Sequence, residues 1–71
     1  MLDLKLLELI ISDSGMTMVS LAEKSGILRE TLYNKMRGIS EFKASEIAAL
    51  TRVLKLTSEQ RDAIFFAENS E

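Results

Sequence analysis

The sequence contains no cysteine, no histidine and no proline, and only three of its residues are glycines. Without cysteine no disulfide framework can form, and without cysteine or histidine the usual zinc sites are excluded. The common pairs of a nucleophile with a catalytic histidine are excluded as well. Lone carboxylates remain, but nothing in their spacing points to a cleft. We therefore expect no metal site, no cofactor and no enzymatic activity.

The scarcity of helix-breaking residues favours an all-α fold. The glycines stand at positions 15, 26 and 38, near the expected breaks between helices. A chain of 71 residues, of which 46% are hydrophobic, is long enough for one domain with a single small core, over residues 1–71. The apolar N-terminal run LDLKLLELII carries three charged residues, which is too many for a membrane span or a signal peptide. We expect a cytoplasmic protein.

The charge of the chain is unevenly distributed. The net charge of −2 disfavours a nucleic-acid partner, but the local balance matters more than the total. Residues 17–43 hold five cations against three anions, a net charge of +2. Residues 1–16 and 44–71 each have a net charge of −2. The middle of the chain is therefore locally basic.

Apolar residues at helical spacing predict five helices, which we place at residues 2–13, 17–25, 28–37, 44–54 and 58–67. Thr17 is expected to cap the second helix, and TSEQ at 57–60 matches a capping box for the fifth. Phe42 is expected to anchor the loop before the fourth helix. The expected core residues of the first and fourth helices are Leu2, Leu6, Leu9, Ile47, Leu50 and Leu54.

The junction of the second and third helices favours a helix-turn-helix. Ala22 is small, as is needed where two helices cross closely, and Gly26 four residues later suits a sharp turn. Ile27 is expected to fill the corner between the helices. Leu32 and Met36 lie four residues apart on the inner face of the third helix. This arrangement would leave the third helix free to enter a major groove.

The stretch TMVSLAEKSGILRETLYNKMRG at residues 17–38 resembles the helix-turn-helix of the lambda-repressor-like family, which includes phage Cro-type and repressor proteins and xenobiotic-response-element-type regulators. The similarity covers roughly residues 4 to 66. The resemblance implies a five-helix DNA-binding domain, found in a bacterium or a phage-infected cell, that binds operator DNA as a dimer and regulates transcription. Leu28 departs from the Ser or Thr that is usual at the start of the recognition helix, so a side-chain cap is expected to be missing there. The apolar side chain of Leu28 is expected to be exposed.

The resemblance also implies roles for individual residues. Base contacts are expected from Leu28, Arg29, Glu30, Tyr33 and Asn34. An alternative for Glu30 is an ion pair with Arg29 or Lys35. Phosphate contacts are expected from Thr17, Met18, Lys35, Arg37, Ser40 and Lys43.

The C-terminal stretch AIFFAE suggests a second surface. Ile64, Phe65 and Phe66 cannot all face inward on one helix, because neighbours lie about 100° apart. One of them is expected to be exposed or covered by a second subunit, which makes these three residues candidate dimer contacts. The alternative is that one phenylalanine packs in the core and the other is half-buried under the C-terminal tail. An alternative function also stays open. The same fold can serve as a protein-interaction module with no specific DNA target, in which exposed apolar residues contact the partner.

Overall fold

Helices make up most of residues 2–66, the part of the chain that the computed structural model describes, and this part contains no strand. Their bounds are α1 Leu4–Ser14, α2 Met18–Ser25, α3 Arg29–Met36, α4 Ala44–Leu54 and α5 Ser58–Phe65. The predicted all-α class and the five predicted helices are confirmed, and the bounds of α4 are those expected. The helix α5 ends at Phe65, before the predicted end at residue 67, which itself lies outside the described residues.

Side-chain caps explain where three of the helices begin. Thr17 accepts a hydrogen bond from the backbone N–H of Ser20 at 3.1 Å, as predicted. The predicted capping box of α5 is confirmed, because Thr57 and Gln60 each accept from the backbone N–H of the other, at 3.0 and 2.9 Å. Asp3 caps α1 by accepting from the N–H of Leu6 at 3.1 Å, so this helix begins two residues later than the sequence pattern suggested.

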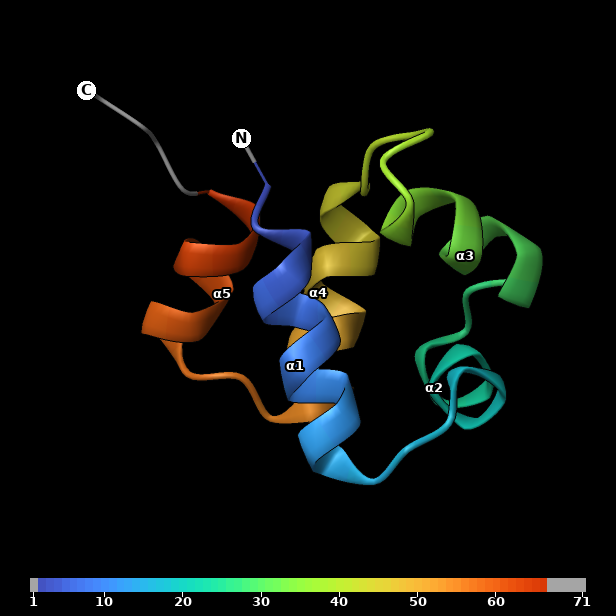
Figure 1. The fold of residues 1–71 in the computed structure, drawn as a ribbon, viewed down its shortest axis with the longest axis horizontal. Coiled ribbons are helices and arrows are strands. Elements are labelled where there is room, and N and C mark those ends of the chain that lie inside the picture. Colours follow the sequence, from blue (N-terminus) through green and yellow to red (C-terminus); the bar gives the residue numbers. More distant parts are fainter. Residues whose placement is uncertain (1, 67–71) are drawn as a thin grey trace.

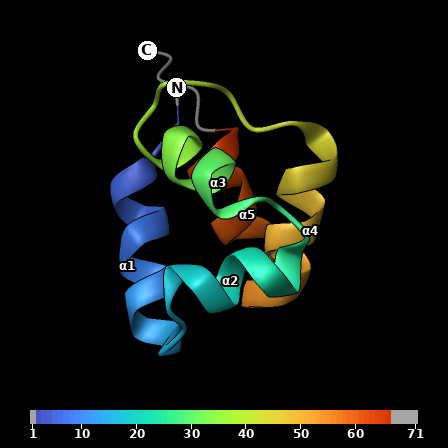
Figure 2. The same ribbon diagram turned by 90° about the vertical axis from the view of Figure 1, so that its right-hand side faces the viewer.

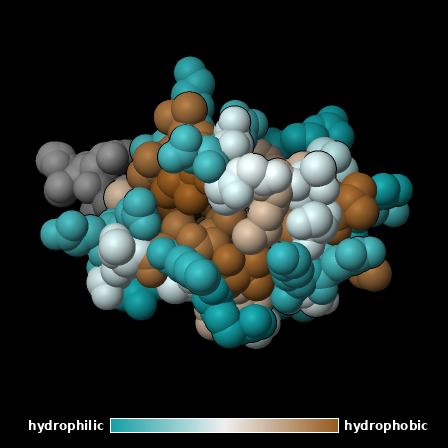
Figure 3. All heavy atoms as spheres, turned by 90° about the horizontal axis from the view of Figure 1, so that it is seen from below, coloured by the Kyte–Doolittle hydropathy of each residue, from teal (hydrophilic) through white to brown (hydrophobic). Residues whose placement is uncertain are grey.

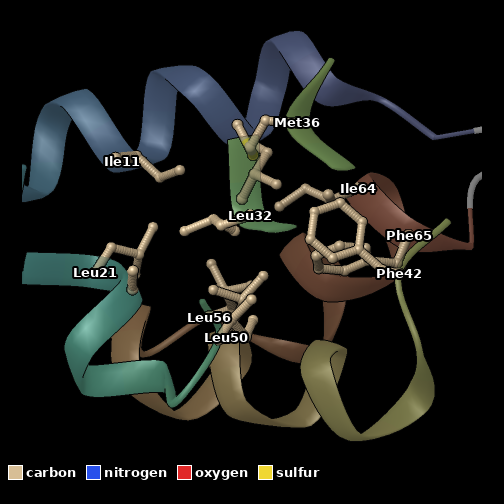
Figure 4. Packing of buried hydrophobic residues seen from close by; sticks show 12 residues of the cluster. Ile11, Leu21, Leu32, Met36, Phe42, Leu50, Leu56, Ile64 and Phe65 are labelled. Atoms are coloured by element: carbon tan, nitrogen blue, oxygen red, sulfur yellow. The ribbon is translucent and has the colours of Figure 1, made fainter. Parts of the chain in front are cut away.

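The core takes one fully buried residue from each helix, namely Leu7, Leu21, Leu32, Leu50 and Ile64. Figure 4 shows the side chains of four of them pointing toward one another, namely Leu21, Leu32, Leu50 and Ile64. Phe42, in the connection before α4, packs edge-on against Phe65 with ring centroids 5.3 Å apart. The predicted anchoring of this connection by Phe42 is therefore confirmed.

The buried face of α1 differs from the expected one. Leu7 and Ile11 are buried, whereas Leu9 is 67% exposed. The prediction that Leu9 is a core residue is wrong, because α1 packs on α4 and α5 through the side centred on Leu7. Leu9, two positions after Leu7, lies about 200° away around the helix and faces outward. Leu2 and Leu6 are only partly buried, as are Ile47 and Leu54 on α4.

The helices are arranged so that α2 and α3 form one end of the long axis and α5 forms the other (Figure 1). Viewed from the end formed by α2 and α3, α3 lies between α1 and α4, and α2 crosses below α3 (Figure 2). Seen from below, hydrophobic side chains reach the surface between hydrophilic ones (Figure 3), in keeping with a core bordered by partly buried apolar residues. None of the helices in residues 2–66 has the length and apolar character needed to cross a bilayer.

Candidate functional site

The turn between α2 and α3 is made by Gly26 and Ile27. Gly26 has a φ of +76°, in the left-handed region that glycine adopts without strain. The carbonyl oxygen of Ala22 accepts from the N–H groups of Gly26 at 3.0 Å and of Ile27 at 3.2 Å, which closes the end of α2. Ile27 is buried and holds the turn to the core. The chain therefore leaves α2 sharply and enters α3 after a single further residue.

That residue, Leu28, precedes α3 with an extended backbone and makes no side-chain cap. Its side chain is 77% exposed. The predicted loss of the cap and the predicted exposure of Leu28 are both confirmed. Leu32 and Met36 are buried, so the inner face of α3 is also as predicted.

The outer face of α3 borders a shallow depression in the molecular surface. All five residues expected to contact bases line it, namely Leu28, Arg29, Glu30, Tyr33 and Asn34, together with Thr31 and Arg37. Two guanidinium groups and one carboxylate give the depression a net positive charge of one. Most of its side chains are exposed, while Thr31 and Asn34 are partly buried. The depression therefore combines forked cationic donors, a side-chain amide, a carboxylate and apolar surface.

Lys35 is placed differently from the expectation for a phosphate contact. Its ammonium group donates to Oε1 of Glu46 on α4, and the side chains of the two residues are only 6% and 14% exposed. Lys35 lies on the inner face of α3, next to Met36, so the ammonium does not face outward with the residues of the depression. The alternative in which Lys35 pairs with Glu30 is also wrong. Among residues 2–66 the ion pairs are Lys35–Glu46 and Arg61–Asp62.

Glu46 has a second partner. The same oxygen, Oε1, accepts from the backbone N–H of Lys43 at 2.7 Å, just before α4. Burial alone would raise the pKa of Glu46, but the hydrogen bonds from Lys35 and Lys43 and the positive charges of both residues lower the pKa below its ordinary value. Glu46 is therefore held as a carboxylate.

The Lys35–Glu46 pair was missed at the sequence level, although two signals were present. Lys35 stands three residues after Leu32 and directly before Met36, which places it on the inward side of α3. Glu46 stands three residues after the residue that precedes α4, where a glutamate accepts from the backbone of that residue. An inward lysine needs a buried counter-charge, and Glu46 is the partly buried carboxylate that meets it.

Of the other residues expected at phosphates, Arg37 alone lines the depression. It is exposed at the end of α3. Ser40 and Lys43 are exposed in the connection between α3 and α4. Thr17 is exposed, and its hydroxyl is used as the cap of α2. Met18 is partly buried and borders a neighbouring hollow that Tyr33 and Arg37 also line.

The residues expected at a dimer contact are separated by the structure. Ile64 and Phe65 are buried in the core of their own chain, so neither offers a free surface. Phe66 is 54% exposed and lines a groove with Phe42 and Ile47. The prediction that one of the three residues is exposed is confirmed, and the exposed residue is Phe66.

The described part of the chain contains no group of three or more His, Cys, Asp or Glu residues that could hold a metal ion. Comparison of the whole chain with models of protein families, with curated proteins and with solved structures finds no match.

Proposed function

We propose that this protein is a sequence-specific DNA-binding transcriptional regulator of the phage or prophage repressor type. In this proposal α2 and α3 form a helix-turn-helix of the lambda-repressor-like kind, and α3 enters the major groove. One observation carries the proposal: five residues chosen from the sequence as base contacts line a single depression along the outer face of α3. A helix that reads bases needs side chains able to reach base edges on the face that enters the groove.

The side chains of the depression match the edges of the four bases. Arg29 can donate two hydrogen bonds to O6 and N7 of guanine, and Asn34 can pair with N6 and N7 of adenine. Glu30 can accept from N4 of cytosine. Leu28 and Tyr33 offer apolar surface to thymine methyl groups. The chemistry of α3 therefore suits reading of a mixed sequence.

The phosphate contacts we propose are fewer than the sequence suggested, because Lys35 is paired inside the protein. Arg37 and Lys43 remain as flanking cations, with Ser40 and the N-terminal turn of α2 at Thr17 and Met18 as neutral donors. Each phosphate neutralised contributes about −0.9 to the slope of log Kobs against log salt, so two cations in each of two subunits give about −4. A slope near −10 would contradict this assignment.

The chain is proposed to act as a homodimer on DNA, because two-fold operators with half-sites about 34 Å apart require two copies of α3. Phe66, exposed beside the groove that Phe42 and Ile47 line, is the residue we assign to the dimer contact. A shared α5 surface would leave α3 free, because α5 and α3 lie at opposite ends of the long axis (Figure 1).

A second candidate function is a protein-interaction module on the same fold. The observation that favours it is the 77% exposure of Leu28 beside Tyr33, which is also exposed. Apolar side chains that cluster on a surface mark protein contacts as well as thymine contacts.

The proposal is tested by selecting bound duplexes from a random pool. The selection uses the wild-type chain, Arg29→Ala and Asn34→Ala. Lys5→Ala, at an exposed position of α1, is the control. We expect the wild type and the control to enrich the same paired half-sites. Each site variant should lose preference at one position per half-site. If no duplex is enriched, the DNA proposal is refuted and the interaction module is favoured. Enrichment that both site variants leave unchanged would refute the residue assignment.

A further inference from the structure

The partly buried pair of Lys35 and Glu46 connects α3 to α4. Lys35 is on the last turn of α3, and Glu46 is on the first turn of α4. Among the described residues, theirs is the one side-chain hydrogen bond that joins these two helices. The helix α3 packs mainly against α2, so this hydrogen bond links it to a second helix.

The anchors of α3 differ in what they can determine. Leu32 and Met36 bury apolar surface, which stabilises α3 but is non-directional. The bond from Lys35 to Glu46 is a charge-assisted hydrogen bond, which requires a defined position of both groups. The helix has eight residues and no side-chain cap, so little within α3 itself sets its direction. Among the side chains that hold α3 to the core, Lys35 therefore makes the directional contact.

Glu46 is a suitable fixed point for that anchor. Its Oε1 accepts from the Lys43 N–H at 2.7 Å as well as from Lys35, so one oxygen joins α3, the residue before α4 and α4 itself. Replacing a buried ion pair by apolar or neutral residues of similar shape is often neutral or stabilising. The stability of the fold therefore does not by itself account for this pair.

We propose that Lys35 and Glu46 are positioning residues, whose partly buried pair fixes the orientation in which α3 presents its outer face. The pair touches no base or phosphate in this account and acts through Arg29, Tyr33 and Asn34. The consequence for DNA rests on the function proposed above, whereas the orientation of α3 is a property of the free protein.

The test compares the wild type with Lys35→Met/Glu46→Gln, in which both charges are removed and the shapes are nearly kept. The introduced glutamine side chain can still accept from the Lys43 N–H. The matched control is Lys5→Met/Glu59→Gln, which makes the same two changes at exposed positions of α1 and α5. Both variants leave the net charge unchanged. Three quantities are measured: the unfolding midpoint, the amide residual dipolar couplings of α3, and the affinity for the duplex enriched by the wild type.

We expect Lys35→Met/Glu46→Gln to stay folded. The residual dipolar couplings of its α3 should no longer fit the wild-type orientation of this helix. Its duplex affinity should fall about tenfold, the loss that follows when one good base contact is misaligned. The control should match the wild type in all three measurements. Couplings that still fit the wild-type orientation, or a double variant that fails to fold, would overturn the positioning role. If the orientation of α3 changes in Lys35→Met/Glu46→Gln but the wild type binds no duplex, the positioning role is supported and the proposed function is refuted.

Discussion

Replacing Leu28 by serine is expected to stabilise the protein while changing what α3 reads. Leu28 occupies the N-cap position with an extended backbone and no side-chain cap. A serine there can accept from the backbone N–H of Thr31, as Thr17 does from Ser20 at the start of α2. Such a cap stabilises by about 1 kcal/mol. Leucine at this position is 77% exposed, and full burial is worth about 1.5–3 kcal/mol, so its removal costs about 0.5 kcal/mol.

The control that separates the two effects is Leu28→Ala, which removes the leucine and adds no cap. The serine variant should exceed the alanine variant by about 1 kcal/mol, or about 4–8 °C in the unfolding midpoint for a domain of this size. Thermal unfolding followed by circular dichroism measures the difference. Equal midpoints for the two variants would refute the capping argument. On DNA, Leu28→Ser should weaken a thymine preference at one position of each half-site.

Three further predictions concern the elements that hold α3 in place. Thr17→Ala should lower the free energy of unfolding by about 1 kcal/mol, because the cap of α2 is lost; Thr17→Ser in the same urea titration should stay near the wild type. Gly26→Ala should lower it by about 1–2 kcal/mol through the positive φ alone, since no atom lies within 4 Å of an added Cβ, and Gly26→Asn should lower it less. If the two Gly26 variants are equally destabilised, the strain is not conformational. The lowered pKa of Glu46 raises the free energy of unfolding at neutral pH. This contribution should be lost as the pH falls below 4.5, the ordinary pKa of a glutamate, because the unfolded state then binds the proton more readily than the folded state. Urea titrations of the wild type and Glu46→Gln across this range should therefore converge at low pH, and parallel curves would contradict the role of this carboxylate.

Much of the fold was predictable because local signals and the core agree. Thr17 and Thr57 stand directly before apolar spacing of a helical period, and each begins a helix in the structure. Gly26 ends α2 because only a residue tolerant of positive φ fits there without strain. The outer face of α3 followed from the same periodicity, since Leu32 and Met36 define the opposite side.

The remaining features depend on packing between helices, which a single helix pattern does not contain. Leu9 belongs to an apolar stripe wide enough to be centred in more than one way, and the contact of α1 with α4 and α5 selects Leu7 and Ile11. The resemblance implies a phosphate contact for Lys35, whereas its position in the structure depends on Glu46, which lies eleven residues away on another helix. Likewise, the choice of Phe66 over Phe65 as the exposed ring depends on where Phe42 packs.

The central claim, that the outer face of α3 reads bases, is tested most directly by a double-mutant cycle across the interface. The cycle combines Arg29→Ala with replacement of one guanine in the selected duplex by 7-deazaguanine, which lacks the N7 acceptor. If Arg29 donates to that guanine, the two changes should not add, and their coupling should be about 1 kcal/mol or more at the one guanine that Arg29 contacts. Purely additive losses at every guanine of the half-site would contradict the account.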